Sequence, residues 1–315
     1  MITRADVINN TRQYVPPGMQ DWMPTSDTRV FNPANPAHTF HSGYTTGRQY
    51  GVLPYVFGGF DSRTRFLVRI NNGTCPGGWD RREPLPGGLP GRTTADWYRN
   101  PPSGLGYGAR VPGNLAGIDC SGYVLRCWGF SSRRIGGVWY STRNLPRLCV
   151  PVDRASLKPG DILNRAGRHV RIFNAHRGAQ VNIFEARGGG YNRAYRAGDT
   201  RGRVINRDIA WDDNYMPYSP FPQLRLTQPA NGLALTPRPK LEIKIWGSGE
   251  LQIVHFEFDS RSILPQTSRT CPMYASYTPS YDLRPGNRYL LRIRVINRIA
   301  GQSFQDEASF EVCRL

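Results

Sequence analysis

Cys120 is the residue of this chain best placed for nucleophilic chemistry. It stands in the stretch DCSG, between Asp119 and Ser121, and the following residues, YVLRCWGF, predict a helix that begins here. The N-terminus of a helix carries partial positive charge and unpaired N–H groups, which favour a thiolate over a thiol. Most cysteines are small buried apolar residues, but this position indicates a nucleophile.

Such a thiolate needs a base and a group that orients the base. Residues 169–187, HVRIFNAHRGAQVNIFEAR, alternate apolar and polar residues on both sides of a turn and predict a β-hairpin. His169 lies on the first strand and Glu185 on the second, so the hairpin can bring their side chains together. We expect Glu185 to accept a hydrogen bond from the His169 ring, and we interpret His176 as a solvated residue of the turn.

Five short motifs occur in an order that resembles the NlpC-type cell-wall cysteine peptidases. They are PYVFGG, DCSG, LKPGDIL, HVRIF and IFEA, and the resemblance covers residues 5–186. Members of this family have a papain-like fold and cleave peptide bonds in the stem peptides of peptidoglycan. The resemblance therefore implies this fold and activity, with no cofactor. It also implies cleavage between γ-D-Glu and the diamino acid.

The same resemblance implies roles for individual residues. The family's nucleophile falls on Cys120, its base on His169 and its third polar residue on Glu185. Three further positions match substrate-binding groups of the family: Tyr55, Asp119 and Ser121. Asp119 is also expected to cap the helix. Glu at the third position is unusual for the family, and Arg171 stands where a glycine is usual.

The predicted elements divide the chain into an α+β domain and an all-β domain. Residues 1–222 are expected to form the papain-like cysteine peptidase domain, and residues 223–315 an immunoglobulin-like sandwich, with a Pro-rich join between them. Residues 61–116, rich in Gly, Pro and Arg, are interpreted as an irregular insertion. The stretch LRPGNRY resembles a tyrosine-corner turn of such sandwiches, and Trp246 is expected in their core.

Charge and composition indicate the class of partner. The formal net charge is +18, with 41 Lys and Arg against 23 Asp and Glu. A surface this basic favours an anionic partner, so we expect anionic wall polymers beside the stem peptides. The arginines are scattered and no nucleic-acid-binding motif accompanies them, so nucleic acid is not expected.

No segment approaches the ~18 apolar residues of a membrane helix, so no membrane span is expected. The first residues, MITRADVINNTRQYV, do not look like a signal peptide. The family resemblance nevertheless implies a secreted, periplasmic or cell-wall-associated protein.

Cysteine and histidine spacing gives two further expectations. Cys271 and Cys313 both fall in the C-terminal domain and are expected to form a disulfide. The sequence does not assign partners among the remaining cysteines: Cys75, Cys127 and Cys149. His38 and His41 have helical i,i+3 spacing, but no cysteine or carboxylate completes a metal site, so no metal is expected.

Two alternative functions stay open. The first is an amidase or acyltransferase that acts on a non-wall substrate with the same nucleophile, its cleft reshaped by the insertion. The second is a non-catalytic, basic wall-binding protein on an inherited peptidase scaffold. The presence of Cys120, His169 and Glu185 together argues against the second alternative. The scissile bond, the role of the insertion and the oligomeric state do not follow from the sequence.

Overall fold

The computed structural model describes most of the chain. The exceptions are residues 20, 26–28, 33–34, 42–43, 45, 57, 78–114, 189–202 and 268–271. The chain packs into two compact units: unit 1, with Met1–Ala5, Asn144–Asp161 and Met216–Leu315, and unit 2, with Asp6–Arg143 and Ile162–Tyr215. The chain therefore enters unit 1 three times, whereas the sequence analysis expected a single division between residues 222 and 223.

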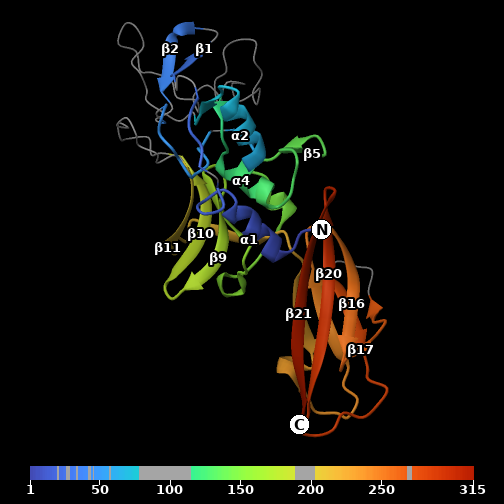
Figure 1. Cartoon of the computed structure of the whole chain (residues 1–315). Helices are drawn as coiled ribbons and strands as arrows, with labels where there is room; N and C mark the ends of the chain where they lie inside the picture. Colours follow the sequence, from blue (N-terminus) through green and yellow to red (C-terminus); the bar gives the residue numbers. More distant parts are fainter. Residues whose placement is uncertain are drawn as a thin grey trace. The chain divides into compact units, whose positions relative to one another are not determined.

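Unit 2 combines helices with an antiparallel sheet, which is the α+β content expected (Figure 1). Its described helices are α1 (Arg4–Arg12, whose first two residues belong to unit 1), α2 (Arg63–Asn71) and α4 (Cys120–Cys127). The strands, in sheet order β11-β10-β9-β8, are β11 (Arg203–Ala210), β10 (Gln180–Arg187), β9 (His169–Arg177) and β8 (Ile162–Arg165). Helix α4 packs against β9 and β10. Short antiparallel pairs are β1 (Arg29–Asn32) with β2 (Asn35–His41) and β5 (Arg134–Ile135) with β6 (Val138–Trp139), and a parallel pair is β3 (Cys75–Pro76) with β4 (Leu115–Ala116).

The expectation of an irregular insertion over residues 61–116 is wrong at its start, where α2 forms. Ser62 caps this helix, since its Oγ accepts a hydrogen bond from a backbone N–H of the first turn at 3.2 Å. Phe66 and Ile70, four residues apart, are buried. A cap and a buried pair stabilise a helix even next to a Gly- and Pro-rich stretch. Residues 78–114 of the expected insertion lie outside the described residues.

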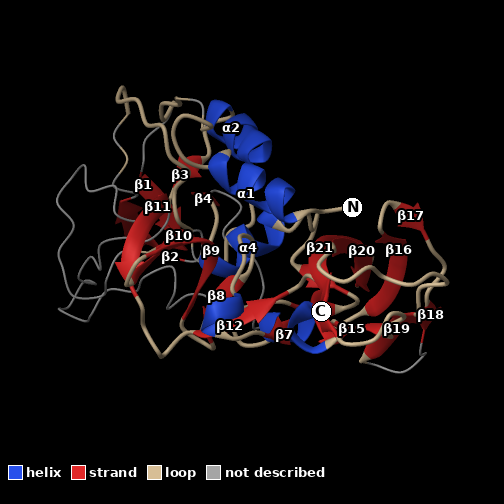
Figure 2. Cartoon of the chain, turned by 90° about the horizontal axis from the view of Figure 1, so that it is seen from below, coloured by secondary structure: helices blue, strands red, loops and turns tan. Residues whose placement is uncertain are grey.

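Unit 1 contains two stacked sheets (Figure 2). One has the order β13-β15-β19-β18, from β13 (Gln223–Gln228), β15 (Leu241–Trp246), β19 (Met273–Tyr277) and β18 (Gln266–Thr267). The other has the order β14-β21-β20-β16-β17, from β14 (Leu233–Ala234), β21 (Gln302–Arg314), β20 (Arg288–Ile299), β16 (Glu250–Phe258) and β17 (Arg261–Ser262). Strands β7 (Val150–Pro151) and β12 (Met216–Ser219) pair, and the 3-10 helices are η1 (Leu145–Leu148), η2 (Arg154–Ser156) and η3 (Ala230–Gly232).

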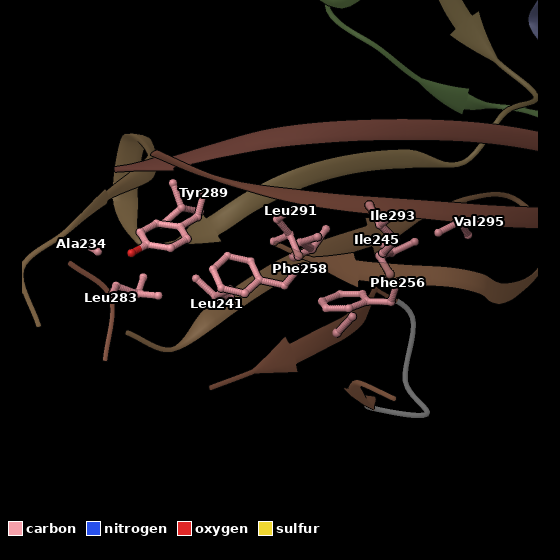
Figure 3. Packing of buried hydrophobic residues seen from close by; sticks show 13 residues of the cluster. Ala234, Leu241, Ile245, Phe256, Phe258, Leu283, Tyr289, Leu291, Ile293 and Val295 are labelled. Carbon is pink, nitrogen blue, oxygen red and sulfur yellow. The ribbon is translucent and has the colours of Figure 1, made fainter. Parts of the chain in front are cut away.

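The core of the sandwich is apolar and continuous (Figure 3). Ile245 of β15 and Leu291 of β20 are both fully buried in it, and the rings of Phe258 and Tyr289 stack with centroids 5.8 Å apart. The predicted tyrosine corner is present, since the backbone N–H of Arg284 donates to the Tyr289 hydroxyl at 2.8 Å. The β-sandwich content expected from the sequence is therefore confirmed.

The expectation that Trp246 lies in this core is wrong. Burial alternates along β15, with Leu241, Ile243 and Ile245 buried and the residues between them half-buried. Trp246 is on the second face of the strand, where the Lys244 ammonium lies 5.7 Å from its ring. Because successive side chains of a strand point to opposite faces, Trp246 lies on the face opposite to Ile245 and outside the core.

An N-terminal segment belongs to unit 1 because it packs on β21 and on the turn before β8. Ile2 forms a parallel bridge with Phe304. Arg4 donates from Nη1 to Asp161 Oδ1 at 2.8 Å and from Nε to Asp306 Oδ2 at 2.9 Å. Asp161 is fully buried, so this ion pair compensates a charge that would otherwise be costly to bury.

Candidate active site

Cys120 is the first residue of α4, and Asp119 holds this end of the helix. The Asp119 backbone is extended, and its Oδ1 accepts from the N–H of Gly122 at 2.6 Å and from the Ser121 hydroxyl at 3.2 Å. The predicted N-cap is therefore present. Cys120 itself is 7% exposed, which places its sulfur in a largely dry environment.

The electrostatics of the Cys120 thiol differ from the sequence expectation. Burial, together with the negative charge of Asp119, raises the pKa of this thiol to about 12, against a smaller opposing effect of Arg133. The backbone N–H of Val170 interacts with the sulfur and also favours the thiolate. The helix N-terminus alone does not offset the desolvation, so the resting group is a neutral thiol.

The imidazole of His169 and the carboxylate of Glu185 are in direct contact, as the hairpin predicted. His169 Nε2 lies 2.7 Å from Glu185 Oε2, and Glu185 is 1% exposed. The hairpin that carries them is formed by β9 and β10, which pair antiparallel. With Nε2 donating to the carboxylate, a neutral His169 carries its lone pair on Nδ1, which is the tautomer that a base needs.

Two arginines also hold Glu185. Arg171 on β9 donates from Nε to Oε2 at 3.0 Å, and Arg207 on β11 donates from Nε to Oε1 at 2.8 Å. Burial alone would raise the pKa of Glu185, but the hydrogen bond and charge of His169 and the charges of both arginines lower it to about 2. Glu185 is therefore a carboxylate at any pH near neutrality, held by three donors on the two neighbouring strands, β9 and β11.

Tyr215 and Arg207 are site residues that the sequence analysis did not identify. The guanidinium carbon of Arg171 lies 4.0 Å from the centroid of the Tyr215 ring, which also meets the His169 ring edge-on at 6.4 Å. Arg207 lies opposite Ile183 in the β10–β11 register. Because that register depends on long-range pairing across the undescribed residues 189–202, no local pattern could have indicated Arg207.

Strand β9 connects the surroundings of Cys120 with those of His169. Val170, whose N–H interacts with the Cys120 sulfur, directly follows His169. Helix α4 packs on this strand and on β10. The structure therefore shows His169 in contact with Glu185, and the residue after His169 in contact with Cys120.

The three expected substrate-binding residues cluster at the same place. Tyr55 is buried and bridges Ile118, two residues before Cys120. A Cβ added at Gly188 would lie 3.2 Å from the Tyr55 ring, so this ring lies beside the end of β10. The Asp119 carboxylate already accepts from several internal donors, among them the Gly58 N–H at 2.9 Å. Its oxygens are thus satisfied within the protein.

The structure describes the side chains of three cysteines outside the site. Cys127, Cys149 and Cys313 are free. Of the expected Cys271–Cys313 disulfide, the structure describes only Cys313, because Cys271 lies outside the described residues. Cys313 on β21 lies opposite Arg288 of β20 in the strand register. Within the described residues, no group of three His, Cys, Asp or Glu side chains could hold a metal ion.

Comparisons with known proteins add little to this geometry. No family model matches the chain, and no curated protein matches it. An engineered protein of known structure is similar at 12% identity over 30% of this chain and 20% of its own length, with a TM-score of 0.21. The fibronectin(III)-like modules of Clostridium thermocellum CbhA are similar at 16% identity over 44% of this chain and 87% of theirs, with a TM-score of 0.19. Both TM-scores are too low to indicate a shared fold. None of the described helices has the length and hydropathy to cross a membrane.

Proposed function

We propose that this protein is a papain-like cysteine peptidase that hydrolyses peptide bonds in the stem peptides of bacterial peptidoglycan. One observation carries the chemistry: a buried carboxylate, Glu185, orients an imidazole, His169, on the strand that also contacts the Cys120 sulfur. Nucleophilic cysteine catalysis requires this set of three groups. The choice of peptidoglycan, and of the bond after γ-D-Glu, rests on the order of the sequence motifs.

The reaction proceeds by acyl transfer to sulfur. His169 takes the thiol proton on Nδ1, and the sulfur attacks the carbonyl carbon of the scissile bond. The resulting oxyanion accepts a hydrogen bond from the backbone N–H of Cys120. His169 then gives its proton to the leaving amine, and a water, deprotonated by the same imidazole, attacks the thioester and releases the acid.

The raised pKa of Cys120 and the lowered pKa of Glu185 bear on when the Cys120 thiol loses its proton. In the resting protein the thiol keeps its proton, because burial raises its pKa to about 12. The permanently charged Glu185 stabilises the imidazolium that forms when the sulfur attacks. We therefore infer that deprotonation accompanies substrate binding and does not precede it.

The proposal is tested with soluble peptidoglycan fragments and mass spectrometry of the products. Wild-type protein is compared with Cys120→Ala and with Glu311→Gln, an exposed residue of β21 that serves as the control. We expect stem-peptide cleavage by the wild type and by the control, and none by Cys120→Ala. Equal cleavage by Cys120→Ala would exclude the sulfur as nucleophile. If the wild type leaves every stem peptide intact, the wall substrate is wrong.

The net charge gives a second, independent readout. A chain with a formal charge of +18 is attracted to anionic wall polymers. Sedimentation of the protein with purified cell walls is expected to decrease as the salt concentration rises, because salt screens exposed charges beyond ~10 Å at 0.1 M ionic strength. Binding that does not change with salt would contradict an electrostatic attachment.

A further inference from the structure

Arg133 donates hydrogen bonds to two groups at the N-terminal end of α4, the Asp119 carboxylate and the Gly59 carbonyl. It is 4% exposed. Its Nη1 donates to Asp119 Oδ2 at 2.8 Å, and its Nη2 donates to Asp119 Oδ1 and, at 3.1 Å, to the backbone carbonyl of Gly59. The pair is bidentate, which fixes the carboxylate plane as well as its position.

Arg133 also packs closely against residues around the first turn of α4. Its guanidinium carbon lies 5.8 Å from the centroid of the Phe60 ring and 5.5 Å from that of Trp139. A Cβ added at Gly122 would collide with Nη2 of Arg133 and with the Gly59 carbonyl oxygen. The arginine therefore crosses directly over the first turn of α4, at the one residue without a side chain.

We propose that Arg133 is a positioning residue that joins three pieces around the sulfur of Cys120: the Gly58–Gly59 turn, the Asp119 cap and the first turn of α4. Through Asp119, Arg133 fixes where α4 begins, and thus where the sulfur lies. Its positive charge also offsets the buried carboxylate that directly precedes the nucleophile. The catalytic meaning of this clamp rests on the proposed function, whereas the clamp itself does not.

Among the described residues, several ionisable groups lie near the sulfur or the imidazole. Asp119 and Arg133 lie beside the sulfur, His169 lies on β9, and Glu185 on β10 is paired with that imidazole and with Arg171. Of these, the negative charge of Asp119 disfavours a thiolate at Cys120 and the positive charge of Arg133 favours it. Without the guanidinium, the Asp119 carboxylate would act on the sulfur uncompensated.

The test measures alkylation of Cys120 by iodoacetamide from pH 6 to pH 11, read on the peptide that contains Cys120 by mass spectrometry. Arg133→Met is expected to lower the rate at pH 8 by about tenfold and to move the profile about one pH unit upward, the effect of losing a nearby opposite charge. Arg133→Lys, which keeps the charge, is expected to restore most of the pH profile. Arg134→Met, the exposed neighbour, is the matched control and is expected to match the wild type.

A double variant separates the proposed role from a general loss of structure. Asp119→Asn combined with Arg133→Met removes both charges, so its profile is expected to return toward that of the wild type. An unshifted profile for Arg133→Met would overturn the proposal, and so would a double variant shifted as far as Arg133→Met. Because alkylation needs no substrate, a wild type that cleaves no stem peptide would refute the proposed function and leave this test unaffected.

Discussion

The surroundings of Glu185 keep its side chain in the ionised form. Three donors from β9 and β11 converge on its carboxylate: His169, Arg171 and Arg207. Each favours the ionised form, and together they outweigh the cost of burial. The sequence predicted the contact with His169 because the hairpin is local. It did not predict Arg207, because the pairing of β11 with β10 is not local.

The lowered pKa of Glu185 predicts how stability depends on acid pH. Between about pH 2 and its ordinary value of 4.5, the unfolded carboxyl is protonated and the folded one is not. Unfolding therefore takes up a proton in this window, and stability falls as the pH falls through it. We expect Glu185 to contribute about 3 kcal/mol to the free energy of unfolding above this window, and this contribution to be lost below it.

The measurement is urea unfolding at several pH values for the wild type and Glu185→Gln. The variant is expected to be less stable at pH 7 and to have a flatter dependence between pH 2 and pH 5. Glu311→Gln, which removes an exposed ion pair with Arg288, is the control, since such pairs contribute little. Parallel curves for the wild type and Glu185→Gln would show that the carboxylate is not specially stabilised.

The buried thiol of Cys120 predicts slow alkylation of the resting protein. Because burial raises its pKa to about 12, the thiolate is scarce at neutral pH. The rate of reaction with iodoacetamide at Cys120 is expected to keep rising through pH 9 and pH 10, with Cys313 as an internal reference for the reagent. A rate that levels off below pH 8 would instead indicate a preformed thiolate–imidazolium pair.

At the scale of elements, the first turn of α4 explains the glycine of the DCSG motif. Gly122 has helical backbone, where alanine is ordinarily better by about 1 kcal/mol. Here a Cβ would collide with Arg133 and with the Gly59 carbonyl. We therefore expect Gly122→Ala to destabilise the protein by 2 kcal/mol or more, roughly the cost of overpacking a rigid site.

Thermal unfolding of Gly122→Ala beside Asn9→Ala tests this expectation. Asn9 is an exposed residue of α1, where alanine meets no obstacle. Asn9→Ala is expected to leave the melting temperature unchanged or slightly raised, and Gly122→Ala to lower it by several degrees. Equal melting temperatures of the two variants would mean that Arg133 and the Gly59 carbonyl shift at little cost to accommodate the added methyl group.

Elements with a strong local pattern were predicted well, and elements that depend on partners were not. The hairpin of β9 and β10, the strands of the sandwich and the helix after Cys120 follow from alternation, turns and a capping residue. Helix α2 was missed because the composition around it suggested a loop. Arg133 was missed because it binds Asp119 across 14 positions, and no spacing rule connects an arginine before a short strand to a helix cap.

At the scale of the molecule, unit 1 is assembled from three separate parts of the chain. The buried Asp161 is paired with Arg4, and Arg4 in turn is paired with Asp306 of β21. Ser248 donates to the carbonyl of Leu148 at 2.9 Å. The sandwich therefore supplies hydrogen-bond partners to Arg4 and Leu148, which lie 302 and 100 positions before those partners.

These contacts predict that residues 1–222 are less stable without the rest of the chain. A fragment of residues 1–222 lacks Asp306, Phe304 and Ser248, so Arg4 loses one of its carboxylate partners and Ile2 loses its bridge. We expect the fragment to unfold at a lower temperature than the full chain, measured by circular dichroism. The full chain with Asp306→Asn is the matched comparison, since it weakens one contact and leaves the sandwich in place. If the fragment melts at the temperature of the full chain, the sandwich is a detachable module, and its contacts with residues 1–5 contribute nothing to the stability of the remainder.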